Sequence, residues 1–337
     1  MKVAVCYEPG KPLVIEEWEI PKINEDEVLI RVECCGVCHS DIHIVDGDWA
    51  DRVRYPVVPG HEVVGVVVDK GKNVRNVEIG ERVGMPWVYS SCGVCDYCVE
   101  GEEQLCPEYK ITGISVQGGY AEYMKAPANF ITKVPEGLKP EEAAPLFCAG
   151  LTVYSALRRV GLKAGERVAV HSIGGLGHLA VQFAKAMGGF VVAISSSKDK
   201  EELVKKLGAD EFVYDDENVP KRLKDLGGMD VIITTSFVSG SIERLINGLA
   251  PRGRLTFVGN AQEPIKIYPR EILGKRLVIT GSAVGNRKLL RETLRFAKEW
   301  NIRPMVEVFG FERVNEALDV VRKGKARFRA VLKPSQP

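Results

Sequence analysis

Residues 167–187 read RVAVHSIGGLGHLAVQFAKAM, and three parts follow one another in them. The apolar run Arg167–Ile173 predicts a strand, and the glycines after it predict a turn. A helix is predicted next, because one face would carry Leu176, Leu179, Ala180, Phe183, Ala184 and Met187. A pyrophosphate could approach the helix N-terminus over the turn backbone, which consists of Gly174, Gly175, Leu176 and Gly177. Ser172 replaces the first glycine of the usual G-x-G-x-x-G pattern, and we expect binding to survive this change.

Apolar runs of the same kind recur through the middle of the chain. Strands are predicted at Arg167–Ile173, Phe190–Ser195, Glu211–Tyr214, Asp230–Thr235, Arg254–Val258 and Leu277–Thr280. Helices are predicted between several of them, including Glu201–Leu207, and before them at Leu151–Val160. Strands that alternate with helices imply a parallel sheet covered on both faces. Six such strands fit a doubly wound, dinucleotide-binding α/β domain of the Rossmann type.

The second of these strands indicates which dinucleotide binds. It ends in hydroxyl and ammonium groups and not in an acid: Ser195, Ser196, Ser197 and Lys198. An NAD site would place Asp or Glu near this point for the ribose 2′-OH, whereas these groups suit a 2′-phosphate. The sequence therefore predicts NADP(H) in preference to NAD(H). The alternative is a helix cap, because Ser and Asp both favour helix starts and Asp199 follows.

The two ends of the chain have a different pattern. Before about residue 150, short strands such as Val28–Val32, Val63–Val68 and Tyr120–Met124 lie among frequent Pro and Gly residues. After about residue 285, two helices and two strands are predicted at Arg287–Trp300, Val306–Phe309, Phe311–Lys323 and Phe328–Leu332. This tail is too short to form a domain alone, so we expect it to pack onto the first part.

Four cysteines lie within 15 residues of each other and predict a structural zinc site. They are Cys92, Cys95, Cys98 and Cys106. Four thiolates complete a tetrahedral zinc shell without any other ligand. An iron–sulfur cluster is the nearest rival, but a ferredoxin run has three residues before its last cysteine and this one has seven. A disulfide among the four is a further alternative.

A second metal site is predicted from residues further apart. Cys38, His61 and Cys148 would supply three ligands and leave one position open, as a catalytic zinc requires. Asp41 could orient His61 through a hydrogen bond. The other cysteines are interpreted as buried apolar residues, and two histidines as structural: Cys6, Cys34, Cys35, His171 and His178.

Together these motifs resemble the zinc-containing medium-chain alcohol dehydrogenases over nearly the whole chain. They occur in the family's order: Gly60-His61-Glu62, the four-cysteine lobe, Cys148 and the GGLGH turn. The resemblance implies a GroES-like catalytic domain at 1–149, a Rossmann cofactor domain at 150–284, and a C-terminal return to the catalytic domain at 285–337. The stretch Ser195–Lys198 is most similar to the cinnamyl alcohol dehydrogenase branch, which prefers NADP(H).

The resemblance also implies residue roles. Cys38, His61 and Cys148 would bind the catalytic zinc, and Glu62 would stand behind the metal or exchange onto it. Ser40 would take the alcohol proton, and His43 would pass it to solvent. Thr152 would contact the nicotinamide, and Arg329 would contact the pyrophosphate. Trp49 and Trp87 would line the substrate pocket. The two tryptophans are equally compatible with ordinary core aromatics.

The implied reaction is a reversible hydride transfer between NADP(H) and an alcohol or the matching aldehyde or ketone. Two zinc ions per subunit are expected, one acting as a Lewis acid on the substrate oxygen. Alternatives are a zinc-independent quinone-type reductase, a non-catalytic NADPH-binding redox sensor and a zinc-ribbon nucleic-acid binder. The balance of 46 Lys+Arg against 45 Asp+Glu disfavours nucleic acid and anionic membranes as partners.

Composition adds the remaining expectations. Nine cysteines are an odd number, which excludes complete pairing into disulfides. No apolar run approaches the roughly 18 residues that span a bilayer, and the start of the chain does not resemble a signal peptide. We therefore expect a cytoplasmic enzyme. Family members are dimers or tetramers, and similarity to microbial members favours a homotetramer over a homodimer.

Overall fold

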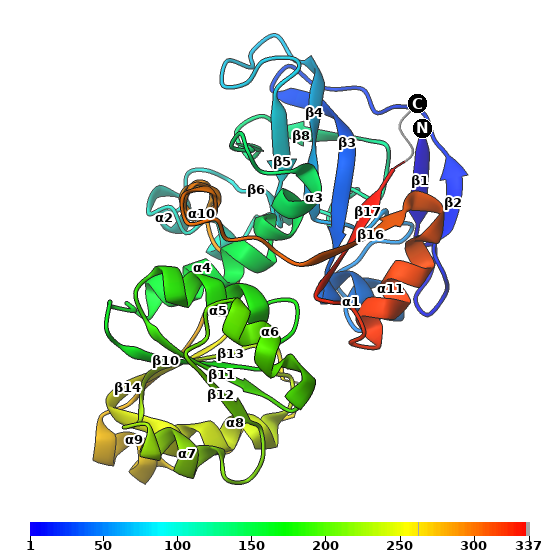
Figure 1. The fold of residues 1–337 in the computed structure, drawn as a ribbon. Coiled ribbons are helices and arrows are strands. Elements are labelled where there is room, and N and C mark those ends of the chain that lie inside the picture. The colour runs from blue at the N-terminus through cyan, green and yellow to red at the C-terminus, as the bar shows by residue number, and fades with distance from the viewer. Residues whose placement is uncertain (262, 335–337) are drawn as a thin grey trace. The chain divides into compact units, whose positions relative to one another are not determined.

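The computed structural model describes residues 1–261 and 263–334. The chain divides into two compact units (Figure 1). One unit is Thr152–Val284, and the other combines Met1–Leu151 with Gly285–Pro337. Each unit contains its own main sheet.

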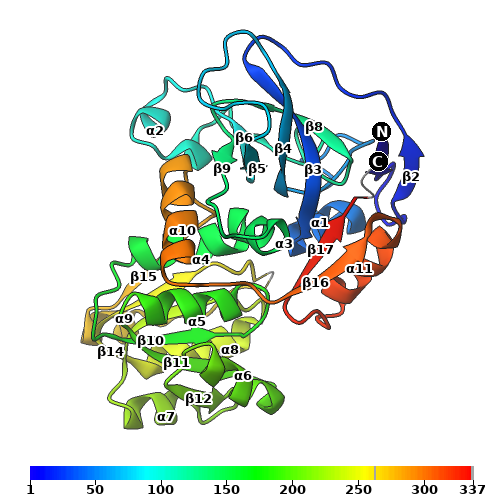
Figure 2. The ribbon, with the colours of Figure 1, turned by 45° about the horizontal axis from the view of Figure 1, so that its top comes forward.

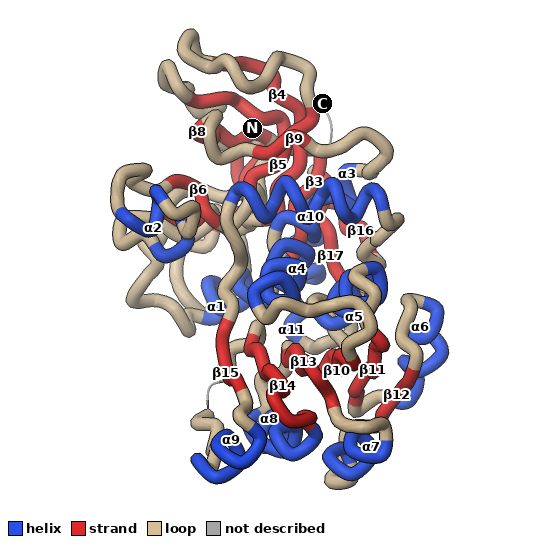
Figure 3. The backbone as a smooth tube through the Cα atoms, turned by 90° about the vertical axis from the view of Figure 1, so that its left-hand side faces the viewer, coloured by secondary structure: helices blue, strands red, loops and turns tan. Residues whose placement is uncertain are grey.

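In the Thr152–Val284 unit, the described residues form a six-stranded sheet in the order β12-β11-β10-β13-β14-β15 (Figure 3). All neighbouring strands are parallel. The strands are β10 (Arg167–His171), β11 (Phe190–Ser195), β12 (Glu211–Tyr214), β13 (Met229–Thr234), β14 (Leu249–Phe257) and β15 (Val278–Gly281). The central residues of β10, β11 and β13 are buried Val, Ile and Ala, as expected for a sheet covered on both faces, whereas the edge strand β15 is partly exposed. The predicted doubly wound fold is confirmed.

Helix α4 leads into this unit ahead of β10, and the other helices connect successive strands. They are α4 (Ala149–Arg159), α5 (Gly177–Ala186), α6 (Glu201–Lys206), α7 (Val219–Asp225), α8 (Ser239–Leu245) and α9 (Pro269–Lys275), with short 3₁₀ turns η3 (Lys198–Lys200) and η4 (Ile246–Gly248). Strand β14 begins at Leu249, whereas the sequence predicted Arg254. Leu249 pairs with Met229, and the register then shifts before Arg254 pairs with Val231. The polar residues within this irregularity interrupt the apolar run and hide the start of the strand.

The other unit contains a mainly antiparallel sheet in the order β16-β17-β3-β4-β5-β9, with β8 paired to β3. Its strands are β3 (Glu27–Val37), β4 (Glu62–Lys70), β5 (Arg82–Met85), β8 (Tyr123–Pro127), β9 (Thr132–Lys133), β16 (Val306–Gly310) and β17 (Arg329–Lys333). Two small sheets pair β1 (Lys2–Val5) with β2 (Val14–Glu17), and β6 (Val88–Ser90) with β7 (Lys110–Ile111). Helices and turns are α1 (His39–Asp46), α2 (Asp96–Val99), η1 (Glu103–Leu105), α3 (Pro140–Ala143), η2 (Ala144–Phe147), α10 (Arg287–Glu299), η5 (Phe311–Arg313) and α11 (Val314–Arg322).

The C-terminal tail completes this sheet. Strand β17 runs antiparallel to β3, with Ala330 opposite Val37, and parallel to β16. Helix α11 lies beside β16 and β17 (Figure 2). This pairing places Arg329, the first residue of β17, next to the end of β3, where Cys38 follows.

The predicted strand Tyr120–Met124 is only partly correct, because β8 begins at Tyr123. Tyr120 instead lies beside a different segment: its N–H donates to Pro59 O at 3.0 Å, and its carbonyl accepts from Ala4 N at 2.9 Å. The alternation of apolar residues is real, but the backbone partners change along it.

Candidate functional site

Two adjacent strands bring the first predicted metal ligands together. Cys38 follows β3 and stands at the N-cap of α1, and His61 precedes β4. Gly36 lies opposite Glu62 in the antiparallel register, so the two ligand-bearing segments are neighbours. Cys148 follows η2. One donor atom from each of Cys38, His61, Glu62 and Cys148 lies within 4.8 Å of the others.

This donor set fits a zinc ion. His61 is fully buried, and its Nε2 has no hydrogen-bond partner among the described residues. Its Nδ1 lies 3.2 Å from Asp41 Oδ1, which leaves Nε2 as the ligand atom. Hydrogen bonding with Cys148 lowers the pKa of Cys38 well below its usual value, and His61 acts in the same direction. A thiolate at Cys38 is the form that binds metal.

Glu62 has a partner that the sequence pattern did not reveal. Arg329 Nη2 forms a buried ion pair with Glu62 Oε1. Burial raises the pKa of Glu62 to about 7, against the opposing effect of the Arg329 charge. Strand β3 leaves room for the carboxylate at Gly36, where a Cβ would lie closer than 3.0 Å to Glu62 Oε2. The structure thus places Arg329 beside the metal group.

Ser40 and His43 both lie on α1. Ser40 Oγ is 3.7 Å from Cys38 Sγ, which places the hydroxyl next to a metal ligand. His43 Nδ1 lies 2.6 Å from Asp48 Oδ2, and the imidazole is partly exposed. The carboxylate therefore fixes the orientation of the imidazole ring.

Trp49 and Trp87 connect these groups through ring contacts. The Trp87 ring centroid lies 4.7 Å from that of His61 and 6.2 Å from that of Trp49. Trp49 in turn lies 4.7 Å from the His43 ring. Both tryptophans are only partly buried, although they also pack against the core. Trp87 therefore lies beside a residue of the metal group, and Trp49 lies beside His43.

The four clustered cysteines form the second metal group. The Sγ atoms of Cys92, Cys95, Cys98 and Cys106 all lie within 4.8 Å of one another. The backbone N–H groups of Val94 and Cys95 lower the pKa of the Cys92 thiol to about 7, which favours the thiolate. All nine cysteines are in the described part of the chain and none forms a disulfide. A zinc ion held by four thiolates fits this arrangement.

The glycine turn has the geometry of a phosphate loop. Ser172 adopts φ +70°, the left-handed conformation that the missing glycine would have taken. A Cβ at Gly177 would lie closer than 3.0 Å to Ser172 O, whereas no described atom would lie within 4 Å of a Cβ at Gly174. Gly177 therefore allows the tight turn, and Gly174 leaves open space for a ligand.

The carbonyl groups of this loop are held by residues that the sequence analysis missed. Thr235 Oγ1 donates to Ser172 O at 2.8 Å, and Lys200 Nζ donates to Ile173 O at 2.7 Å. Both histidines interpreted as structural have partners: His171 Nδ1 lies 2.9 Å from Thr234 Oγ1, and His178 Nδ1 lies 3.0 Å from Gly174 O. Apart from the local contact of His178, these contacts join distant residues, and no local sequence pattern marks them.

The end of β11 presents the groups predicted to bind the 2′-phosphate. Ser195 is buried, and its Oγ accepts from Ser197 N at 3.2 Å, while Ser196 and Lys198 are exposed. The Lys198 ammonium lies 4.9 Å from the centroid of the Tyr214 ring. In the described structure, the Ser197 side chain makes no hydrogen bond that caps η3.

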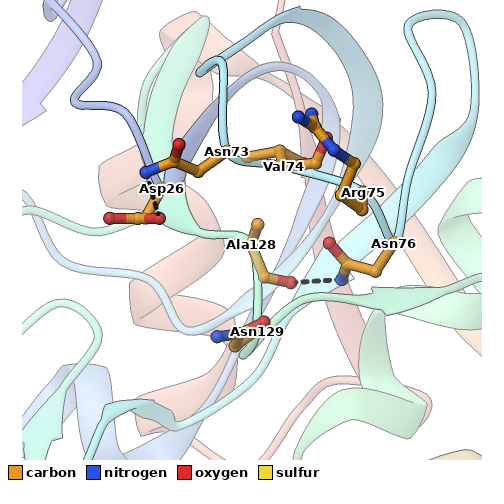
Figure 4. A pocket seen from close by; sticks show the side chains of 7 residues that line it. All are labelled: Asp26, Asn73, Val74, Arg75, Asn76, Ala128 and Asn129. Atoms are coloured by element: carbon orange, nitrogen blue, oxygen red, sulfur yellow. Dashed lines mark hydrogen bonds between the residues drawn. The ribbon is translucent and has the colours of Figure 1, made fainter.

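A small surface cavity of about 160 Å³ lies in the unit that contains Met1–Leu151 (Figure 4). Two of its polar side chains donate hydrogen bonds to other residues of the lining. Asn73 Nδ2 donates to Asp26 Oδ1 at 3.0 Å, and Asn76 Nδ2 donates to Ala128 O at 2.7 Å. This cavity has none of the metal-binding residues in its lining.

Comparison with known proteins agrees with these sites. Residues 24–136 match the alcohol dehydrogenase GroES-like domain family, and residues 175–299 match the zinc-binding dehydrogenase family. An alcohol dehydrogenase from Geobacillus stearothermophilus is 45% identical over 337 residues, covering 99% of each chain. A cinnamyl alcohol dehydrogenase from Sorghum bicolor superposes with a TM-score of 0.91 at 33% identity, covering 98% of this chain and 97% of that one. An alcohol dehydrogenase from Aeropyrum pernix gives 0.91 at 31% identity, covering 99% and 100%.

The chain therefore belongs to the zinc-containing medium-chain alcohol dehydrogenases. Its activity is that of a zinc-dependent, NAD(P)-dependent alcohol dehydrogenase acting on CH–OH donors, with small alcohols or carbonyl compounds as substrates. Both metal groups of such an enzyme are present. Within residues 1–261 and 263–334, no helix has the length and apolarity needed to cross a membrane.

Proposed function

We propose that this dehydrogenase transfers a hydride between NADP(H) and an alcohol or the matching aldehyde or ketone, at a zinc held by Cys38, His61 and Cys148. The observation that carries the proposal is the buried donor cluster with an unpartnered His61 Nε2. When bound, zinc supplies a Lewis acid for the substrate oxygen and the nicotinamide supplies the hydride chemistry. Glu62, paired with Arg329, provides a carboxylate behind the ligands.

Proton movement is assigned to Ser40 and His43. The Ser40 hydroxyl neighbours Cys38 and would exchange a proton with the substrate oxygen. His43 would carry that proton to solvent at Nε2, while Asp48 accepts from Nδ1 and fixes the ring orientation. In the reducing direction the same groups would deliver a proton.

Cofactor binding is assigned to the glycine turn and to the end of β11. Gly174, Gly175, Leu176 and Gly177 would receive the pyrophosphate, and Thr152 on α4 would contact the nicotinamide. A pyrophosphate contact from Arg329 is also proposed, although its Nη2 already binds Glu62.

Ser195, Ser196, Ser197 and Lys198 would receive the 2′-phosphate. Two acids that follow the neighbouring strand β12 are ion-paired, since Arg244 Nη2 lies 3.3 Å from Asp215 Oδ1 and Arg222 Nη2 lies 2.9 Å from Asp216 Oδ2. That pairing supports an anion at this strand end. The preference for NADP(H) follows from this charge pattern.

Further assignments rest on the same residues. Trp49 and Trp87 would line a substrate pocket suited to bulky or aromatic carbonyl compounds. The zinc of Cys92, Cys95, Cys98 and Cys106 would be structural. The domain boundaries after residues 149 and 284, and a cytoplasmic location, stay predictions.

A homo-oligomer, either tetramer or dimer, is proposed from the sheet edge. β15 is the last described strand of its sheet and is largely accessible, with Val278 53% exposed. Such an edge has unpaired backbone groups that a second copy could satisfy. Measuring the molecular mass in solution tests this, and a monomer would contradict it.

The experiment that tests the proposal follows the 340 nm absorbance of NADPH and of NADH with aliphatic aldehydes and cinnamaldehyde. Faster turnover with NADPH is expected. Faster turnover with NADH would retain the dehydrogenase activity and contradict the role of the serines and Lys198. Tight NADPH binding without turnover of any carbonyl would instead favour a redox sensor, and turnover resistant to zinc removal would favour a quinone-type reductase.

A further inference from the structure

The carboxylate of Asp41 is the centre of a fully buried hydrogen-bond cluster next to the catalytic metal group. Its Oδ1 accepts from Gly60 N at 3.2 Å and lies 3.2 Å from His61 Nδ1. Its Oδ2 accepts from Cys38 N at 2.8 Å and from the Tyr120 hydroxyl at 2.9 Å. Four donors thus surround one carboxylate, which has about four acceptor positions.

Three of these donors belong to the segments that carry Cys38 and His61, and the fourth does not. Tyr120 comes from another part of the chain, and its backbone N–H is bonded to Pro59 O at 3.0 Å. Its ring packs directly on Gly60, which has φ +97° and where a Cβ would lie 2.5 Å from Tyr120 Cδ1. Packing requires only the ring. The hydroxyl has a separate role, which is to bind Asp41.

We propose that Tyr120 is a positioning residue of the catalytic metal centre. Its hydroxyl fixes the Asp41 carboxylate, and Asp41 in turn holds His61 Nε2 and the Cys38 segment in the arrangement that retains zinc. The inference rests on the proposed assignment of Cys38, His61 and Cys148 as ligands. Groups that orient metal ligands commonly change metal affinity or activity by about 10- to 100-fold when removed. Because Tyr120 is one of four donors to Asp41, removing its hydroxyl should have an effect at the lower end of that range.

Zinc release provides a test that does not depend on turnover. Wild type and Tyr120→Phe are mixed with excess chelator, and release is followed with a colorimetric zinc indicator. The Cys92–Cys106 zinc serves as an internal reference, and a Cys38→Ala protein identifies the phase that belongs to the catalytic site. Tyr89→Phe is the matched control, because Tyr89 is also buried but its hydroxyl faces Lys125 O at 3.4 Å.

The expected result is that Tyr120→Phe releases the catalytic-site zinc about 10-fold faster, with the other phase unchanged and Tyr89→Phe like wild type. Equal release from wild type and Tyr120→Phe, or equal acceleration of both phases, would overturn the proposal. If wild type contains zinc only at the four cysteines, the ligand assignment itself fails, which is a different outcome.

A double-mutant cycle with Asp41→Asn separates positioning from general stability. In an Asp41→Asn background, the Tyr120→Phe change should add little to zinc release, because its partner is already altered. Full additivity of the two changes would contradict the proposal.

Discussion

Replacing Gly177 by alanine should damage the phosphate loop before any cofactor arrives. The new Cβ would lie closer than 3.0 Å to Ser172 O, a backbone atom that cannot turn aside as a side chain could. Thr235 Oγ1 also holds that carbonyl at 2.8 Å. The strain must therefore be relieved by moving the start of α5 or the loop itself.

The cost can be estimated from overpacking in other proteins, which lowers the free energy of unfolding by about 1–3 kcal/mol. For domains of this size that corresponds to a fall in melting temperature of roughly 3–10 °C. Gly174→Ala is the matched control. No described atom would lie within 4 Å of its Cβ, so the cofactor-free protein should melt like wild type or slightly higher.

Thermal unfolding and NADPH titration by fluorescence, applied to both variants, distinguish the two effects. Gly177→Ala should lose stability and cofactor affinity together. Gly174→Ala should lose affinity alone, by about 5- to 160-fold if its methyl group costs about 1–3 kcal/mol against the pyrophosphate. A Gly177→Ala protein with the melting temperature of wild type would contradict this prediction, and so would a Gly174→Ala protein that melts as low as Gly177→Ala.

Three further predictions concern charged groups. Arg329→Met leaves Glu62 buried without its counter-charge and should lower the free energy of unfolding by about 3–5 kcal/mol in urea titrations; a loss below about 1 kcal/mol would mean that the pair is dispensable. Lys198→Met should raise KM for NADPH by about 10-fold, as a charge-assisted contact of about 1.4 kcal/mol predicts, and leave KM for NADH unchanged; equal effects on both would remove its 2′-phosphate role. Burial acts to raise the pKa of Asp215, but hydrogen bonds and charges from His171 and Arg244 outweigh burial and lower that pKa. The lowered pKa stabilises the fold above the unfolded pKa near 3.8, and this stabilisation is lost as pH falls through the lower folded pKa. Arg244→Met should therefore flatten the acid limb of a curve of unfolding free energy against pH. An unchanged acid limb would contradict this prediction.

The sequence predicted the parallel sheet because its strands are apolar runs whose pattern is local. Phe190–Ser195 and Glu211–Tyr214 match β11 and β12, since no glycine or proline interrupts either run. The metal groups were equally visible, because zinc requires thiolate and imidazole ligands that stand out by residue type. Ser172 was recognised as a departure, and its left-handed φ shows how the turn forms without glycine.

The features that the sequence did not predict are contacts between distant segments. Arg329 pairs with Glu62 across 267 positions of sequence, and Tyr120 reaches Asp41 across 79. Thr235 and Lys200 hold loop carbonyls through side chains that carry no motif. Such partners depend on strand register and on which backbone segments meet, and a single sequence does not reveal either.

The most direct test of the zinc assignments is the zinc content per chain of purified wild type and of Cys38→Ala, measured by atomic emission. Two binding groups are present among the described residues, and only one of them contains Cys38. We expect two zinc ions in wild type and one in a folded Cys38→Ala protein that still binds NADPH but turns over no substrate. Two zinc ions and wild-type turnover in Cys38→Ala would show that the catalytic metal is not bound by Cys38.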